Sequence, residues 1–433
     1  MCGGVFYVYA GYPALLHVWA KVRRRRALNE PASSRSRVEW EPSVSFVIAG
    51  RNEGARIQGR VANLRGLDYP SGKQQIIVVS DGSTDNTREV LDRLRDEFGV
   101  TPVDAPARGK ALAINAGVSR ATNDILVFAD MRQGFAPDAL RALVAPFRDA
   151  AVGAVSGELV LDGEPRDRRS EEERRAIAER RALDDRRDVR RRTPGKRRGP
   201  RRWTSRRATL ESTVTEGVGL YWRYEKQIRR DESAAGSVVG ATGAIYAMRR
   251  YLWQPLPPDT ILDDVLTPMR VVMAGYRVVF EERACAFDRT AADARAEGRR
   301  KLRTLAGNYQ LLWLEPRLLL PWRNPAWLQF VSHKAGRLLV PYALPAIFVL
   351  SAALAGQSPI YAAALAAQCV FYLLAAYGAQ LERSKGSPAQ SPRPAGLVTP
   401  VNRLARVALM FTVMNKSAVA GLIALVTRQK VWR

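Results

Sequence analysis

Two short apolar runs that each end in a carboxylate constrain the fold of this chain more than any other feature. Residues 75–80 (QIIVVS) lead into Asp81, and residues 125–129 (ILVFA) lead into Asp130. Runs of this length and composition predict buried strands of a parallel sheet. In an open α/β sheet, ligands bind beyond the carboxyl ends of the strands. We therefore expect both carboxylates to lie in one crevice that binds a cation or a nucleotide.

The segment around these runs predicts an α/β domain with a mostly parallel sheet. Strand-like runs at residues 44–49, 76–79 and 125–129 alternate with stretches that suit helices, which is the pattern of βαβ units. With 433 residues, of which 47% are hydrophobic, the chain can bury one large core or two smaller ones. Disorder throughout is excluded.

The chain is strongly basic, with a formal net charge of +26. This charge favours anionic partners, namely nucleic acid, phosphorylated substrates or the anionic face of a membrane. The three cysteines, Cys2, Cys285 and Cys369, show no pairing or metal-ligand spacing, and the two histidines lie far apart. The sequence therefore supports neither a disulfide scaffold nor a Cys/His zinc site.

An arginine-rich stretch at residues 162–207 holds 19 Lys and Arg against 10 Asp and Glu. It has almost no apolar residues, so we interpret it as a solvated and mobile insertion, partly helical through Glu/Arg pairs. An RNA-binding arm is the alternative, but the aromatic residues that stack on bases are missing apart from Trp203. Nucleic acid is therefore not an expected partner.

The N-terminal segment has the pattern of a membrane anchor. Residues 5–20 are apolar and precede the basic residues 21–26. We therefore expect residues 1–26 to anchor the chain with the basic flank in the cytosol. A signal peptide is the alternative, but no small-residue cleavage site follows the apolar run.

The C-terminal region, residues 338–433, is predicted to contain about three membrane spans. Its apolar runs cover residues 338–354, 360–377 and 407–426. Only Asn415 and Lys416 interrupt the last run, and each run approaches the length of about 20 residues that crosses a bilayer. A soluble helical bundle is the alternative interpretation.

Two flanking features add to this membrane prediction. Residues 317–337 mix tryptophan with arginine and lysine, which predicts an amphipathic helix lying in the membrane interface. Residues 382–394 combine basic residues with proline and serine, as expected for a cytosolic loop. Together these features predict a multi-pass protein of the cell membrane whose α/β domain is cytoplasmic.

A series of motifs follows one another along residues 44–310. They are Arg51, Asn52 and Glu53 after the first strand, residues 81–85 (DGSTD), residues 109–117 (GKALAINAG), Asp130, residues 240–243 (GATG), Asp263 with Asp264, and Arg303. Their order and spacing resemble those of the membrane-embedded family 2 glycosyltransferases, such as the cellulose, chitin, hyaluronan and poly-N-acetylglucosamine synthases. The resemblance implies a GT-A-like cytosolic domain over residues 39–316. It also implies inverting transfer of a sugar from a nucleotide-sugar, a UDP-sugar or a related donor, to a saccharide or lipid acceptor.

The resemblance also assigns donor-binding residues. The acid that matches Asp81 holds the base of the nucleotide, and the residue that matches Arg51 packs on the ring, where a planar guanidinium can replace the usual tyrosine. Glu53 and Lys110 match positions that line the nucleotide and the diphosphate. Arg303 matches the arginine that grips the diphosphate. For Lys110, a solvated lysine at a helix start is the alternative.

The metal-binding motif of the family is altered in this chain. Asp130 matches the first aspartate of the Asp-x-Asp motif, which implies a divalent cation, Mg²⁺ or Mn²⁺. The second position holds Arg132. One carboxylate with diphosphate oxygens can still hold the ion, although more weakly than two. Arg132 can instead neutralise phosphate charge and bind the donor itself, so the sequence leaves metal dependence open.

On the acceptor side, the resemblance makes Asp264 the general base and Asp263 its neighbour. A charge pair at a helix N-terminus is the alternative for these two residues. Gly240, Thr242 and Gly243 belong to a segment that brings backbone close to the acceptor sugar. The glutamine and tryptophan that accompany Arg303 in the family are absent, so the sequence leaves open whether the product is a polymer.

Two rival functions follow from the same residues. One is the transfer of a single sugar to a lipid carrier. The other, from a different class, is a membrane transporter or scaffold with an inactive glycosyltransferase-like domain. The intact carboxylates at Asp81, Asp130 and Asp264 favour an active enzyme.

Overall fold

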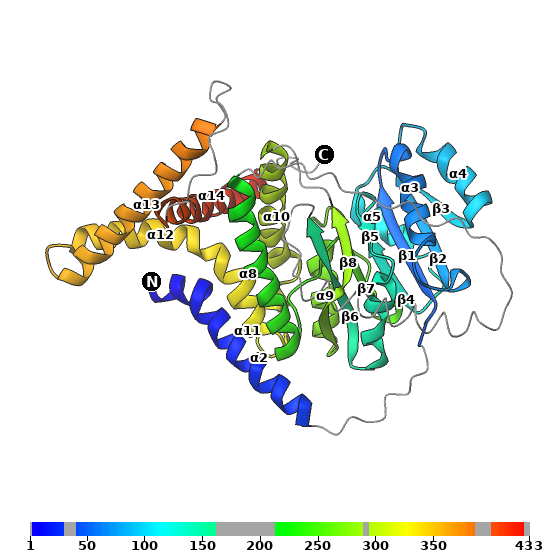
Figure 1. The fold of residues 1–433 in the computed structure, drawn as a ribbon, viewed down its shortest axis with the longest axis horizontal. Helices are drawn as coiled ribbons and strands as arrows, with labels where there is room; N and C mark the ends of the chain where they lie inside the picture. The colour runs from blue at the N-terminus through cyan, green and yellow to red at the C-terminus, as the bar shows by residue number, and fades with distance from the viewer. Residues whose placement is uncertain (1, 30–39, 162–212, 289–293, 386–399, 428–433) are drawn as a thin grey trace, which may run out of the picture.

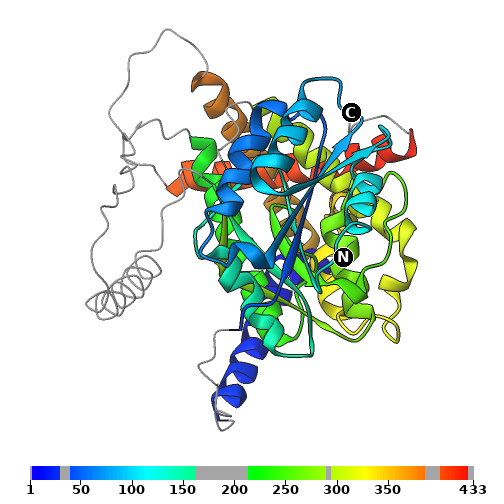
Figure 2. The same ribbon diagram turned by 90° about the vertical axis from the view of Figure 1, so that its right-hand side faces the viewer.

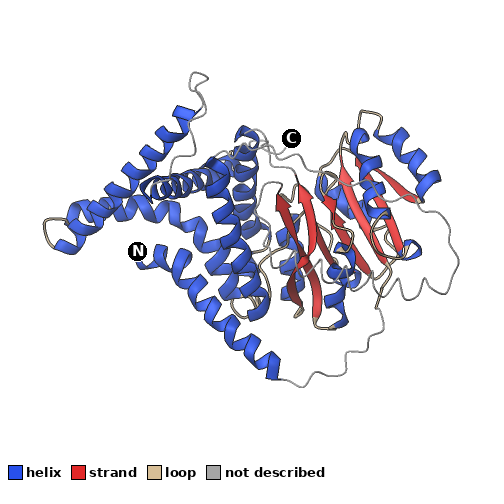
Figure 3. Cartoon of the chain, in the orientation of Figure 1, coloured by secondary structure: helices blue, strands red, loops and turns tan. Residues whose placement is uncertain are grey.

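The computed structural model describes residues 2–29, 40–161, 213–288, 294–385 and 400–427. The strands gather at one end of the molecule and the long helices at the other (Figure 3). The whole arginine-rich stretch at residues 162–207 lies outside the described residues, so its character as a solvated insertion stays a prediction.

The described strands form one eight-stranded sheet in the order β3-β2-β1-β4-β7-β6-β8-β5 (Figure 1). They are β1 (Val44–Gly50), β2 (Gln74–Asp81), β3 (Val100–Ala105), β4 (Ile125–Ala129), β5 (Gly134–Phe135), β6 (Val152–Leu161), β7 (Ile245–Arg249) and β8 (Arg277–Asp288). Strands β1 to β4 are parallel to one another, as are β6 and β8. Strand β7 runs antiparallel to β4 and β6, and β5 runs antiparallel to β8. The predicted α/β fold with a mostly parallel sheet is confirmed.

Helices cover both faces of the sheet. In β2, Ile76 and Val78 pack into one hydrophobic cluster, while Ile77 and Val79 pack into a second, because successive residues of a strand point to opposite faces. The first cluster includes residues of α3 (Gly54–Arg65), α4 (Thr87–Phe98) and α6 (Ala139–Val144); the second includes residues of α5 (Lys110–Val118) and α9 (Asp263–Met273). Burial on both faces explains why the strands appear in the sequence as continuous apolar runs.

The long helices follow the sheet in the chain. They are α8 (Thr213–Ala235), α10 (Ala294–Leu314), α11 (Trp327–Phe330), α12 (Gly336–Leu354), α13 (Pro359–Lys385) and α14 (Pro400–Val426). Short helical turns join the other elements: η2 (Ser71–Lys73), η3 (Ala145–Arg148), η4 (Arg250–Leu252), η5 (Pro316–Leu319) and η6 (Val331–Ala335). Helix α10 packs against α14, where Gly421 lies against the backbone of Leu305 and Ala306.

Within the described part of the chain, three helices are long and apolar enough to cross a membrane. They cover Trp327–Leu354, Pro359–Leu381 and Pro400–Val426. Large apolar side chains on them remain open to the surroundings, among them Leu339 at 68% and Leu373 at 69% exposure. A soluble bundle would bury such residues, so this surface indicates association with a membrane.

The separate interfacial helix predicted over residues 317–337 is wrong as an element. Residues 316–319 form only the short turn η5, and α11, η6 and α12 join into one helix from residue 327 onward. Pro321 and Pro325 lie between the two, and proline with its preceding residue disfavours helix there. The second half of the predicted segment is therefore the start of the first span-length helix.

The N-terminal segment is helical from α1 (Cys2–Phe6) through η1 (Tyr7–Gly11) to α2 (Tyr12–Asn29). Figure 1 shows it beside α8, and Figure 2 shows its blue end extending beyond the strands. Its buried side chains, Val8, Tyr12, Leu16 and Ala20, recur every fourth residue and so form one face. Tyr12 donates a hydrogen bond to Glu232 of α8 at 3.0 Å.

This helix is not among the three described helices that are long and apolar enough to span. Its packing against α8 is a feature that the sequence did not reveal, and the anchor predicted for residues 1–26 stays a prediction. The side chains of Phe6, Leu15 and Val18 remain exposed on other faces of the helix.

Candidate active site

The loop that precedes α5 is tied to the end of β2 through Asp81. One carboxylate oxygen of Asp81, Oδ1, accepts the backbone N–H groups of Arg108 at 3.1 Å and of Gly109 at 3.2 Å. Gly82 follows with a positive φ of 60°, and a Cβ there would lie 2.5 Å from the Cβ of Ala107. Glycine is therefore required where this loop crosses the strand end.

The end of β1 is tied to the same turn through Asn52. The side-chain oxygen of Asn52 accepts the backbone N–H of Thr84 at 2.8 Å, and the backbone N–H of Asn52 donates to Ser83 Oγ at 3.0 Å. Arg51 is exposed beside this junction. The carboxylate of Glu53 pairs with Arg56 at 2.6 Å, so its oxygen already has a cationic partner within α3.

Lys110 lies at the centre of the site. It begins α5, and its Nζ lies 3.2 Å from Oδ1 of Asp130, beyond β4, and 3.5 Å from Oδ1 of Asp263, at the start of α9. Burial alone would lower the pKa of Lys110, but attraction by Asp130, Asp263 and Asp264 outweighs it, and the pKa is raised. Lys110 is thus a charged ammonium held between carboxylates, with about a third of its side chain (35%) still accessible.

Two arginines act on the same carboxylate. Burial alone would raise the pKa of Asp130, but Lys110, Arg132 and Arg303 together lower it. Arg132 comes from the segment after β4, and Arg303 comes from α10. The structure therefore gathers three of the predicted donor-binding cations around Asp130.

The acceptor side is built around Asp264 in the first turn of α9. Its Oδ2 accepts the backbone N–H of Gly243 at 3.1 Å, and its carbonyl oxygen accepts the N–H of Ala241 at 2.7 Å. A Cβ on Gly243 would lie 2.8 Å from Oδ2 of Asp264, and Gly240 has a φ of 92°. Both glycines therefore let the segment at residues 240–243 wrap closely around the carboxylate.

This environment changes the acidity of Asp264. Burial, followed by repulsion from Asp263, raises the pKa of Asp264 from 3.8 to about 6. A carboxylate with a pKa in this range can accept a proton near neutral pH far better than an ordinary aspartate. The arrangement therefore suits a general base.

Sequence reasoning missed the residues that hold Thr242. Arg229 of α8 donates a hydrogen bond to Thr242 Oγ1, and Ser156 Oγ of β6 accepts the Thr242 N–H at 3.0 Å. Neither partner belongs to a motif, because each is distant in the chain and meets Thr242 only in the folded structure. No local signal was available to find them.

The side chains around Asp130 do not form an obvious metal site. Among the described residues, no three His, Cys, Asp or Glu side chains gather where they would hold a metal ion. The second motif position is Arg132, and Lys110 already contacts Asp130. Hard divalent cations require several oxygen ligands, so the donor set does not fit the predicted cation.

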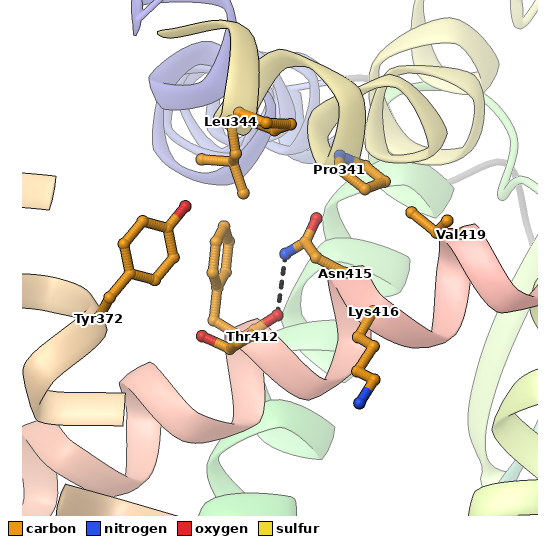
Figure 4. Close-up of a pocket in the computed structure, with 9 residues that line it drawn as sticks. Pro341, Leu344, Tyr372, Thr412, Asn415, Lys416 and Val419 are labelled. Carbon is orange, nitrogen blue, oxygen red and sulfur yellow. Dashed lines mark hydrogen bonds between the residues drawn. The ribbon is translucent and has the colours of Figure 1, made fainter. Parts of the chain in front are cut away.

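A separate cavity of about 190 Å³ lies among the span-length helices (Figure 4). It is lined by Pro341, Leu344, Pro345, Tyr372, Phe411, Thr412, Asn415, Lys416 and Val419. Asn415 is buried and donates to the carbonyl oxygen of Phe411 at 2.8 Å, whereas Lys416 points away from it. The Asn415 side chain thus faces the helix bundle, as expected for a polar group in an apolar helix.

Comparison with known proteins identifies the domain. Residues 45–212 match the family model "Glycosyl transferase family 2". The poly-beta-1,6-N-acetyl-D-glucosamine synthase of Staphylococcus aureus (strain COL) is 33% identical over 116 residues, which cover 26% of this chain and 28% of the relative. The synthase of Staphylococcus epidermidis is 28% identical over 136 residues, covering 31% of this chain and 32% of the relative. The chain therefore matches less than a third of the length of these curated relatives.

A solved structure matches almost the whole chain. It is the mannosyltransferase PcManGT from Pyrobaculum calidifontis in complex with GDP-Man and Mn²⁺, with a TM-score of 0.61 and 21% identity. The match covers 98% of this chain and 97% of the solved one. Likeness at this level shows a shared fold, and the predicted GT-A-like architecture is confirmed.

Proposed function

We propose that this chain, which carries a family 2 glycosyltransferase domain, is an inverting glycosyltransferase of the membrane. It takes a sugar from a nucleotide-sugar, a UDP-sugar or a related donor, and transfers it to a saccharide or lipid acceptor. The observation that carries this proposal is the placement of Asp264. Its pKa, raised to about 6, suits a proton acceptor, and Lys110 connects the neighbouring Asp263 to Asp130 at 3.5 and 3.2 Å.

The chemistry follows from these two adjoining regions. Asp264 accepts the proton of the acceptor hydroxyl while that oxygen forms a bond to the anomeric carbon of the donor sugar. The bond from this carbon to the diphosphate oxygen breaks, and the nucleoside diphosphate leaves with the electron pair. Lys110, Arg132 and Arg303 stabilise the charge that develops on it. A single displacement of this kind inverts the anomeric configuration.

The donor and the acceptor occupy different elements in this proposal. Asp81 and Arg51, at the ends of β2 and β1, hold the nucleotide base, and Glu53 lines the nucleotide. The segment with Gly240, Thr242 and Gly243 approaches the acceptor sugar, because it wraps around Asp264. Arg229 then positions Thr242 for that contact.

A second acceptor class is favoured by one observation. The residue after Arg303 is Thr304, which is exposed, whereas processive members of the family carry a tryptophan that stacks on the growing sugar. Transfer of one sugar to a lipid-linked acceptor is therefore the second candidate. The three span-length helices would hold such an acceptor beside the site.

The proposed topology places the catalytic domain in the cytoplasm and makes the chain a multi-pass protein of the cell membrane. The basic residues 21–26 and the basic, proline-rich loop at residues 382–394 support this orientation.

The test is transfer by the purified protein in detergent or nanodiscs. We would supply labelled nucleotide-sugars, including N-acetylglucosamine and mannose donors, and separate polymer from lipid-linked and free products. Asp264→Asn should abolish transfer while retaining donor binding. Absence of transfer from every donor, or equal transfer by wild type and Asp264→Asn, would contradict the proposal.

A further inference from the structure

We propose that Arg132, with Lys110 and Arg303, takes the place of a divalent cation in stabilising the leaving diphosphate. The inference rests on the proposed function, because it concerns the donor side of the same site. It assigns to this chain a transfer that does not need Mg²⁺ or Mn²⁺.

The segment that carries Arg132 is held in place on both sides. Met131 and Gln133 are 6% and 2% exposed, whereas Arg132 between them is exposed. Gln133 Nε2 donates to Asp288 Oδ2 at 2.7 Å. Two hydrogen bonds, of 2.8 and 3.1 Å, join the Asn63 amide to the backbone of Phe135. Arg132 is thus an exposed residue on a fixed segment, two positions after Asp130, and its charge helps to lower the pKa of that carboxyl.

A second cation, Lys110, lies beside the carboxylate to which a metal ion would bind. Lys110 Nζ lies 3.2 Å from Asp130 and 3.5 Å from Asp263, so its ammonium occupies the space between the two carboxylates. A divalent ion bound to Asp130 would lie close to this ammonium and would be repelled by it. A further positive charge lies behind the segment, because buried Arg60 stacks on the Phe135 ring at 4.2 Å.

The two positions of the motif carry the same net charge in both arrangements, two aspartates with a metal ion or Asp130 with Arg132. Two carboxylates and a divalent cation sum to zero, and so do the single carboxylate of Asp130 and the guanidinium of Arg132. The diphosphate therefore meets an equivalent charge without a metal. A guanidinium also donates two parallel hydrogen bonds to phosphate oxygens, which gives it the geometry as well as the charge for this role.

The first experiment compares transfer by the wild-type protein after exhaustive EDTA treatment with transfer in added Mn²⁺ or Mg²⁺. We expect rates within about twofold of each other, since no step requires the ion. A loss of more than about tenfold in EDTA that Mn²⁺ restores would overturn the inference.

The second experiment changes the charge at the position itself. Arg132→Gln should lower kcat by about 10²-fold, the usual effect of removing one charge-stabilising donor, and Mn²⁺ should not restore it. Arg132→Lys should recover part of the rate. Arg93→Gln is the matched control, because Arg93 is an exposed arginine of α4 whose side chain is 53% accessible. If Arg132→Gln behaves like this control, the assignment is wrong.

The third experiment does not depend on turnover. Arg132→Asp places two carboxylates two residues apart, and this variant should acquire Mn²⁺ binding, measured by electron paramagnetic resonance with UDP or GDP present. Wild-type protein should bind the same nucleotides in EDTA, and Mn²⁺ should change their Kd by less than about twofold. Tight Mn²⁺ binding by the wild type would overturn the inference even if no transfer were detected. Absence of transfer alone would contradict only the proposed function.

Discussion

Replacing Asp264 by asparagine should separate catalysis from stability. The amide cannot accept a proton, but its oxygen can still accept the Gly243 N–H that Asp264 accepts at 3.1 Å. The loop around the site should therefore remain in place while the general base is lost. Removing a general base lowers the rate by about 10² to 10⁴, equivalent to about 3 to 5 kcal/mol of transition-state stabilisation.

The same substitution should stabilise the fold at neutral pH. Burial and Asp263 raise the pKa of Asp264 from 3.8 to about 6, so the folded protein holds this proton more tightly than the unfolded chain does. The stability contributed by the protonated carboxyl is complete below about pH 4 and is lost as the pH rises through about 6. The difference of about two pKa units corresponds to about 3 kcal/mol. Asparagine stays neutral and avoids this loss.

The assay combines initial rates with thermal unfolding at pH 5, 6 and 8. Wild-type transfer should rise with pH through about 6, as Asp264 loses its proton. Asp264→Asn should be slower by about 10² to 10⁴ at pH 8, should melt above the wild type at that pH, and should approach the wild-type melting temperature at the lowest pH. Asp124→Asn is the control, because Asp124 is 95% exposed. A variant that transfers sugar at the wild-type rate, or that melts below the wild type at pH 8, would refute this reasoning.

The remaining predictions concern the loop, the insertion and the topology. Gly243→Ala should lower kcat with little change in donor binding, measured by calorimetry, because its Cβ would lie 2.8 Å from Oδ2 of Asp264; unchanged kcat would contradict the close packing. Deletion of residues 166–202 should leave transfer intact, since the stretch has few apolar residues to join a core, and a purified deletion variant that cannot fold would show otherwise. A reporter that is active only outside the cytosol should be active after Arg433 and near Gln357. Activity near Gln357 alone would mean that the last helix does not span.

Local patterns in the sequence predicted the elements and part of the site. The apolar runs before Asp81 and Asp130 form strands β2 and β4 in the structure. They could be predicted because a strand that is buried on both faces of a sheet requires continuous apolar residues. The three long apolar runs became the three span-length helices for a similar local reason. The resemblance located Lys110 and Asp264, whose proposed roles await experiment.

The bounds of the helices in residues 317–354 could not be predicted from local sequence patterns. Residues 317–337 have the composition of an interfacial helix, yet their second half continues into the helix from Trp327 to Leu354. Composition indicates whether a segment favours water, the membrane interface or the membrane interior. The start of this helix instead depends on where prolines such as Pro325 interrupt the helical backbone.

The sequence by itself determined the three strands at residues 44–49, 76–79 and 125–129, which helices are apolar enough to span, and which motifs indicate sugar transfer, because each of these depends on residues close together in the chain. Only the tertiary structure decided which charges meet. Lys110 contacts Asp263, 153 residues further along the numbering, and Tyr12 bonds to Glu232, 220 residues away. Such pairs form because α5 and α9 pack on the same face of the sheet and α8 lies beside the N-terminal helix. Chain distance carries no information about these contacts, since their geometry follows from the packing of the whole molecule.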